Sequence, residues 1–187
     1  MRRATLLTSL VLCVFCLSLS AAVPQGWFVA GSTPQQYAVA TDASVTYSGK
    51  PSVALRSATG NPTGFVTLMQ SFLPDGYSGK RVRFSGFVKS DQVGGWAGLW
   101  MRIDAGSLTA GFDNMQGRPV QGTTDWTPYS VVLDIPAGST GVNFGILLDG
   151  TGTVWLSGVT FEAVGSDTPV TAMFTTPAAP VNLDFQQ

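Results

Sequence analysis

The sequence predicts an all-β fold, an antiparallel β-sandwich of the jelly-roll, galactose-binding-domain-like kind. Glycine and proline are plentiful, with 22 and 11 of the 187 residues, whereas only 11% of the residues are charged. Short segments alternate between apolar and polar residues at the two-residue period of a strand, and turn-forming residues separate them. No segment after residue 22 has the period of an amphipathic helix. The length suits one domain with a single core.

The first residues have the pattern of a signal peptide. Arg2 and Arg3 precede an apolar run over residues 4–19, and the small residues Ser20-Ala21-Ala22 end it. We expect cleavage after Ala22, which would leave a secreted or periplasmic chain that meets the membrane only through this segment before cleavage. A retained membrane anchor is the alternative, although the run is short for a spanning helix. The domain organisation is therefore residues 1–22 as signal peptide, 23–165 as sandwich and 166–187 as tail.

Strands follow one another through the sandwich segment. Residues 26–31 are a strand or a packed loop, residues 37–47 alternate loosely, and residues 52–57 alternate with Val53 and Leu55 inward. Residues 65–73 are apolar on both faces, as in a strand that is buried between layers. Residues 80–90 alternate cleanly and end before a glycine pair.

The second half of the sandwich has the same character. After the strand over 94–104, residues 108–112 form a short return strand, and a polar, glycine-rich loop is expected over 113–125. Strands at 126–135, 142–149 and 153–164 complete the sheets. In the tail, residues 166–180 are rich in proline, threonine and alanine and should be irregular, whereas VNLDF at 181–185 is strand-like.

The strand GGWAGLWMRID, residues 94–104, has two very different faces. One face carries small and medium apolar groups suited to a core: Ala97, Leu99, Met101 and Ile103. The other carries Trp96, Gly98, Trp100, Arg102 and Asp104. Indoles can stack on a sugar ring, and an arginine can donate paired hydrogen bonds. This face is therefore a binding platform, or else it lies under a loop with Arg102 neutralised by Asp104 or Asp113.

The polar loop is the second candidate site. Asp113, Asn114 and Arg118 lie in it, and Trp126 closes it. Carboxylate and amide oxygens there can hold a Ca²⁺ ion with backbone carbonyls. Local Asx-turn hydrogen bonds that stiffen the loop are the alternative.

Composition excludes several functions. Histidine is absent, and both cysteines, Cys13 and Cys16, lie in the signal segment, so no Ser-His-Asp triad, Cys-His pair or disulfide is available to the mature chain. Without Arg2 and Arg3 the chain has eight basic and eleven acidic residues, a net charge of −3, which argues against a nucleic-acid partner. A hydrolase would have to work through a pair of carboxylates, whereas most acidic residues lie at predicted turns.

Several runs together resemble a known family. They are GKPSVALRS (49–57), VTLMQSF (66–72), GWAGLWMRID (95–104), FDNMQGRP (112–119), GTTDWTPYSVVLDIP (122–136) and PVNLDF (180–185). The chain resembles, over nearly its whole mature length, a bacterial family of small β-sandwich domains that often carry the label of AraC-type or other transcriptional regulators. The resemblance implies the sandwich fold but no activity, and the chain departs from the family's closing motif at Gln186, where an acidic residue is usual.

These observations predict a secreted, non-catalytic module that binds a small ligand, best a carbohydrate or cell-envelope glycan. Trp96, Trp100 and Arg102 would form its platform and residues 113–118 its rim. The alternative is an extracellular protein-interaction or assembly domain without a small ligand, in which VNLDF adds a strand to its own sheet or to a partner's. A hydrolase that acts through aspartates is the third hypothesis.

Overall fold

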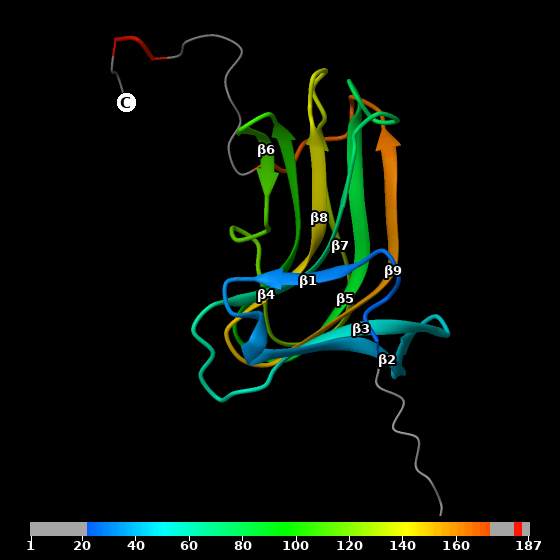
Figure 1. The fold of residues 1–187 in the computed structure, drawn as a ribbon, viewed down its shortest axis with the longest axis vertical. Coiled ribbons are helices and arrows are strands. Elements are labelled where there is room, and N and C mark those ends of the chain that lie inside the picture. Colours follow the sequence, from blue (N-terminus) through cyan, green and yellow to red (C-terminus); the bar gives the residue numbers. More distant parts are fainter. Residues whose placement is uncertain (1–21, 173–181, 185–187) are drawn as a thin grey trace, which may run out of the picture.

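The structure, a computed structural model, describes residues 22–172 and 182–184. These residues form an all-β fold whose strand pairs are all antiparallel (Figure 1). The strands are β1 (Phe28–Gly31), β2 (Tyr37–Tyr47), β3 (Lys50–Ser57), β4 (Phe65–Phe72), β5 (Arg81–Ala105), β6 (Leu108–Asp113), β7 (Val120–Asp134), β8 (Gly141–Asp149) and β9 (Thr153–Val164). A single 3₁₀ turn, Pro34–Gln36, separates β1 from β2. No helix in this part of the chain is long and apolar enough to cross a membrane.

One long strand, β5, belongs to both layers of the sandwich. Its first half, residues 81–91, pairs with β9 and β7, and β9 continues through β3 to the edge strand β2. Its second half, residues 96–104, pairs with β8 and, at its end, with β6, and β8 continues through β4 to the edge strand β1. In Figure 1, β5, β8 and β9 run along the long axis while β1, β2 and β3 cross it. Side chains on one side of each half of β5 therefore face the same core.

The core confirms the alternation expected from the sequence. Ala97, Leu99, Met101 and Ile103 on β5 are all fully buried. They pack with the inner residues of the first layer, among them Val82, Phe84 and Val88, which are fully buried as well. Phe84 meets Phe144 of β8 edge to face at 4.8 Å between ring centroids. Burial of these side chains is the main stabilising term for the fold, at about 25 cal/mol for each Å² of apolar surface.

Two expected boundaries are corrected. The strands expected at 80–90 and 94–104 are one strand, because Gly94 and Gly95 let the chain pass closely beside the 149–151 turn while it stays extended. The loop expected over 113–125 is shorter, because β7 starts at Val120 and pairs with β5 through irregular steps around Gly122, whose φ is +66°. A bulged strand of this kind has no clean alternation in its sequence.

The ends of the domain show where the sandwich stops. The expected signal peptide lies outside the described residues apart from Ala22, whose carbonyl accepts hydrogen bonds from the Thr41 amide and hydroxyl. Residues 166–172 of the tail are irregular but stay bound to β7, since the Thr171 amide donates to the Val132 carbonyl at 2.9 Å. Of VNLDF, only Asn182–Asp184 is described, and these exposed residues form a turn rather than a strand because Asn182 has a φ of +49°.

Candidate functional site

The outer face of the second layer carries the predicted platform. Antiparallel register sets Trp96 beside Asp149, and Asp149 beside Phe65 of β4. Two residues further along β5, Gly98 lies beside Leu147, and Leu147 beside Thr67. The next rows join Trp100 to Gly145 and Met69, and Arg102 to Asn143 and, on its other side, to Phe112 of β6. Gly145 leaves a hollow on β8 beside Trp100, whereas Asn114 and Met115 cover the position of Gly98.

Trp100 lies across this hollow. Its indole Nε1 donates a 2.7 Å hydrogen bond to the Thr67 hydroxyl, which is two strands away on β4. The Thr67 hydroxyl in turn donates to the Ile146 carbonyl at 2.9 Å. An indole on β5 can reach β4 only by lying over β8, where Gly145 presents no side chain. This hydrogen bond fixes the Trp100 indole across β8, with 8% of the Trp100 surface exposed.

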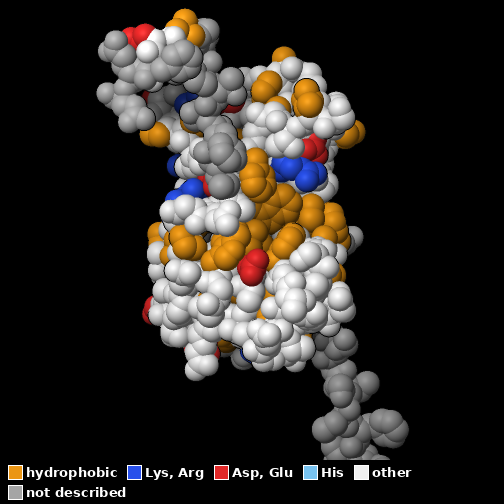
Figure 2. Space-filling view, turned by 90° about the vertical axis from the view of Figure 1, so that its left-hand side faces the viewer, with side chains coloured by type: hydrophobic (Ala, Val, Ile, Leu, Met, Phe, Trp, Pro, Cys, Tyr) orange, Lys and Arg blue, Asp and Glu red, His pale blue; other side chains and the backbone are white. Residues whose placement is uncertain are grey.

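The side chains around Trp100 enclose a pocket of about 550 Å³, a size common for small-ligand sites. It is lined by Ala30, Gly31, Phe65, Thr67, Met69, Trp96, Trp100, Arg102, Phe112, Asn114, Leu147 and Asp149. Figure 2, seen from the side of β1, β4 and β6, shows a continuous hydrophobic area across this face with charged side chains beside it. The structure therefore brings four predicted residues, Trp96, Trp100, Arg102 and Asn114, to one pocket.

Two charged groups line this pocket, and they differ in their pairing. Arg102 Nε and Nη2 donate to the two oxygens of Asp104 at 2.8 and 3.1 Å, and Asn143 donates to Asp104 as well. The backbone of Asp149 pairs with β5 and β4, but its carboxylate forms no hydrogen bond or ion pair with the residues that the structure describes. The Asp149 carboxylate also affects Tyr37. Burial raises the pKa of the Tyr37 hydroxyl, and the nearby negative charge of Asp149 raises this pKa as well.

The predicted loop contributes Asn114 to the pocket, and its Asp113 carboxylate is bound by donors of the loop itself. Asp113 is fully buried, and its oxygens accept from Arg118 Nη1 and Nη2 at 3.1 and 2.6 Å and from the Met115 amide at 2.8 Å. Asn114 Oδ1 accepts from the Gln116 amide at 3.1 Å, an Asx turn. Within residues 22–172 and 182–184, no group of three or more acidic, histidine or cysteine side chains is placed to hold a metal ion.

Trp126 lies elsewhere. Its ring is 5.6 Å from that of Tyr47, which stacks on Phe87 at 3.9 Å. Phe87 points outward from the first half of β5, so this cluster belongs to the outer face of the first layer. The register irregularities of β7 carry Trp126 to the opposite side of the sandwich from the pocket.

Sequence reasoning missed Phe65, Met69, Phe112 and Asp149. The segment 65–73 was expected to be apolar on both faces, and one of those faces is this pocket. Asp149 is the last residue of β8, as of the strand expected at 142–149, but it is not among the predicted site residues. The available signal was the mixed outer face of β4, which alternates Phe65, Thr67 and Met69.

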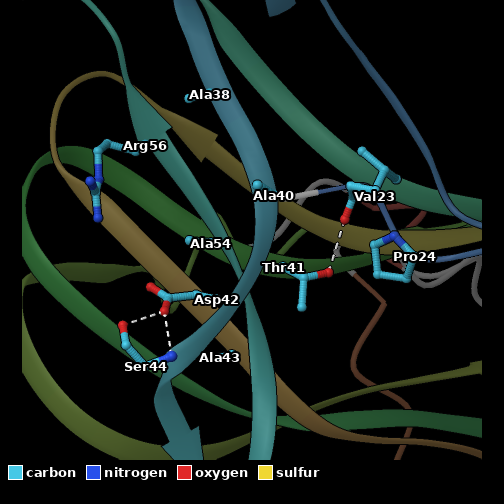
Figure 3. Close-up of a pocket in the computed structure, with 11 residues that line it drawn as sticks. Val23, Pro24, Ala38, Ala40, Thr41, Asp42, Ala43, Ser44, Ala54 and Arg56 are labelled. Atoms are coloured by element: carbon cyan, nitrogen blue, oxygen red, sulfur yellow. Dashed lines mark hydrogen bonds between the residues drawn. The ribbon is translucent and has the colours of Figure 1, made fainter. Parts of the chain in front are cut away.

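A second hollow, of about 780 Å³, lies between residues 22–24 and the β2–β3 hairpin. Figure 3 shows that alanines at positions 38, 40 and 54 form much of its wall. Its polar groups are already engaged, since Asp42 accepts from Ser44 and Arg56 donates to Thr153. It holds no aromatic ring. The pocket over Trp100 is therefore the better candidate site.

Comparison with known sequences confirms the resemblance to proteins labelled as transcriptional regulators. No protein-family model matches the chain. The chain is 41% identical over 168 residues to the uncharacterized HTH-type transcriptional regulator YbfP of Bacillus subtilis (strain 168). The match covers 87% of this chain and 57% of YbfP, so the chain spans little more than half of that relative.

Comparison with solved structures confirms the all-β sandwich. The CBM22-1 xylan-binding domain of Paenibacillus barcinonensis Xyn10C has a TM-score of 0.53 at 21% identity, over 75% of this chain and 86% of the module. TmCBM61 in complex with β-1,4-galactotriose has a TM-score of 0.50 at 12% identity, over 75% and 90%. The enzymatically active domain of bacteriophage CBA120 tailspike protein 4 has a TM-score of 0.57 at 12% identity, over 75% of this chain but 20% of the tailspike chain. At these identities the likeness is one of fold alone.

Proposed function

We propose that this domain is a non-catalytic carbohydrate-binding module and that the pocket over Trp100 holds the sugar. The observation that carries the proposal is the indole of Trp100, fixed by its hydrogen bond to Thr67, in the lining of a pocket that Trp96 also lines. Sugar rings bind to such indole faces through their apolar C–H surface. Modules of the same fold are named for xylan binding and carry galactotriose, which supports a glycan ligand.

The remaining pocket groups suit a binding role. Arg102 and Asn114 supply hydrogen-bond donors in the pocket lining, and Asp149 supplies an acceptor. Because Asp149 is the one carboxylate lining this pocket, it offers no facing pair for glycoside hydrolysis. Binding without hydrolysis is the function that this arrangement supports best.

The test is thermal unfolding and calorimetry of the protein with β-1,4-galactotriose and xylohexaose, the sugars present in complexes of two proteins that contain a similar fold. A ligand that binds only the folded state raises the free energy of unfolding, by about 2.7 kcal/mol at a hundred times its Kd. We expect Trp96→Ala and Trp100→Ala to abolish the rise. Trp126→Ala, which removes an indole from the opposite face, is the matched control and should leave binding unchanged.

Either of two results would reject this proposal. One is equal glycan binding by the parent and by folded Trp96→Ala and Trp100→Ala proteins. The other is the absence of stabilisation across a wide glycan panel, which would favour the protein-interaction function instead.

We also propose that the module works outside the cytoplasm, after export and cleavage behind Ala22. The charged start and apolar run of residues 1–19 support this. N-terminal sequencing of the protein from fractionated cells tests it, with Val23 expected as the first residue. An uncleaved cytoplasmic chain would favour a role closer to the regulator label of YbfP.

A further inference from the structure

Asp149 differs in its surroundings from the other carboxylates near the pocket. The Asp104 and Asp113 carboxylates are each held by an arginine. Asp149 is half-buried at the end of β8 and lines the pocket, and its carboxylate forms no hydrogen bond or ion pair with the residues that the structure describes. A half-buried carboxylate without a partner is unfavourable unless a ligand supplies one.

The charge balance of the pocket is consequently negative. Arg102 is the one basic residue that lines it, and both hydrogen bonds of its ion pair go to Asp104. Arg102 lies six residues further along β5 than Trp96, the β5 neighbour of Asp149. The positive charge is thus compensated, whereas the negative charge of Asp149 is not.

Aromatic rings flank this free carboxylate on both sides. Phe65 of β4 and Trp96 of β5 are the direct cross-strand neighbours of Asp149, and both line the pocket. The faces of aromatic rings attract cations, and the attraction is stronger where water is excluded. A carboxylate between two aromatic rings is a favourable place for a protonated amine.

We propose, resting on the glycan-binding function above, that the pocket selects a cationic amino sugar whose free ammonium group pairs with Asp149 between Phe65 and Trp96. The pyranose ring then lies over Trp100. A uronic acid is disfavoured, because its carboxylate would face Asp149. An N-acetylated sugar can enter but has no charge for Asp149 to pair with.

The experiment compares three oligosaccharides by calorimetry at pH 6 and low salt: a β-1,4-linked glucosamine hexamer, its N-acetylated counterpart and a galacturonate trimer. The parent protein should bind the glucosamine hexamer about tenfold more tightly than the N-acetylated one and should not bind the galacturonate. Asp149→Asn should remove the tenfold preference while the N-acetylated hexamer still binds. Asp75→Asn makes the same change of net charge at an exposed turn and should keep the preference.

The outcomes separate the two proposals. Equal or tighter binding of the N-acetylated hexamer by the parent overturns the amino-sugar proposal and leaves the glycan-binding function intact. Loss of the preference in Asp75→Asn as well as Asp149→Asn overturns it too, as a nonspecific charge effect. Tetramethylammonium that competes as well as the hexamer would mean that the pocket takes simple organic cations and not saccharides. Failure of every oligosaccharide rejects the proposed function itself.

Discussion

Thr67→Val probes the hydrogen bond that holds the floor of the pocket. The substitution keeps the shape of the side chain but removes the hydroxyl that accepts from Trp100 Nε1 and donates to the Ile146 carbonyl. Thr67 is 3% exposed and Trp100 8%, so water cannot easily replace the lost acceptor. An unsatisfied buried donor costs about 2 kcal/mol. For a domain of this size that loss corresponds to a fall in Tm of roughly 4–8 °C.

The assay is chemical and thermal unfolding of the parent, Thr67→Val and Thr67→Ser, with the Trp100 indole N–H followed by NMR. Thr67→Ser keeps the hydroxyl and loses one methyl group, so it should cost about 1 kcal/mol and keep the indole N–H protected from exchange. Thr67→Val should cost more, expose the indole N–H to exchange and weaken glycan binding. Stability of Thr67→Val within about 0.5 kcal/mol of the parent would refute the claim that this bond orients Trp100.

Two further predictions concern the sandwich itself. Hydrogen bonds from Ser44 and then from the Trp155 indole hold the pKa of Asp42 at about 2, below its usual 3.8, so its contribution of about 1 kcal/mol is present above pH 4 and lost as the pH falls toward 2. Denaturant midpoints measured from pH 5 to pH 2 should fall more for the parent than for Asp42→Asn, and parallel curves would contradict this. Gly145→Ala would bring a Cβ to within 2.9 Å of the β4 backbone and should destabilise by roughly 1–3 kcal/mol in urea unfolding. Gly117→Ala, whose Cβ meets nothing within 4 Å, is the control, and equal effects of the two would count against close contact of β4 and β8.

Local pattern was sufficient to predict much of the fold. Leu99 and Met101 on one side of β5 and Trp100 and Arg102 on the other were assigned from the two-residue period, which depends only on strand geometry. The side that faces the core followed from the hydrophobic effect, since only one face of residues 94–104 lacks charge. The turn residues likewise marked most strand ends, because their backbone preferences are local.

The pocket needed information that no single strand contains. Its two groups of opposite charge lie on β5 and β8, and Phe65 lies on β4, so their meeting depends on antiparallel register between distant segments. Trp126 shows that closeness in sequence does not ensure closeness in space. It follows the predicted loop in the chain but lies beside Tyr47 on the outer face of the first layer, away from the pocket.

The sequence by itself determined that this protein is an all-β sandwich and that one strand carries two indoles and an arginine on one face, because strand periodicity and apolar burial act locally along the chain. The tertiary structure alone decided that β5 continues through Gly94 and Gly95 into both layers. It also joined the Trp100 indole to Thr67 and, among the described residues, left the Asp149 carboxylate without a partner beside two aromatic rings. Those features arise from strand pairing between residues 37 to 84 positions apart in the chain, and pairing partners are selected by the packing of the whole core rather than by any one segment.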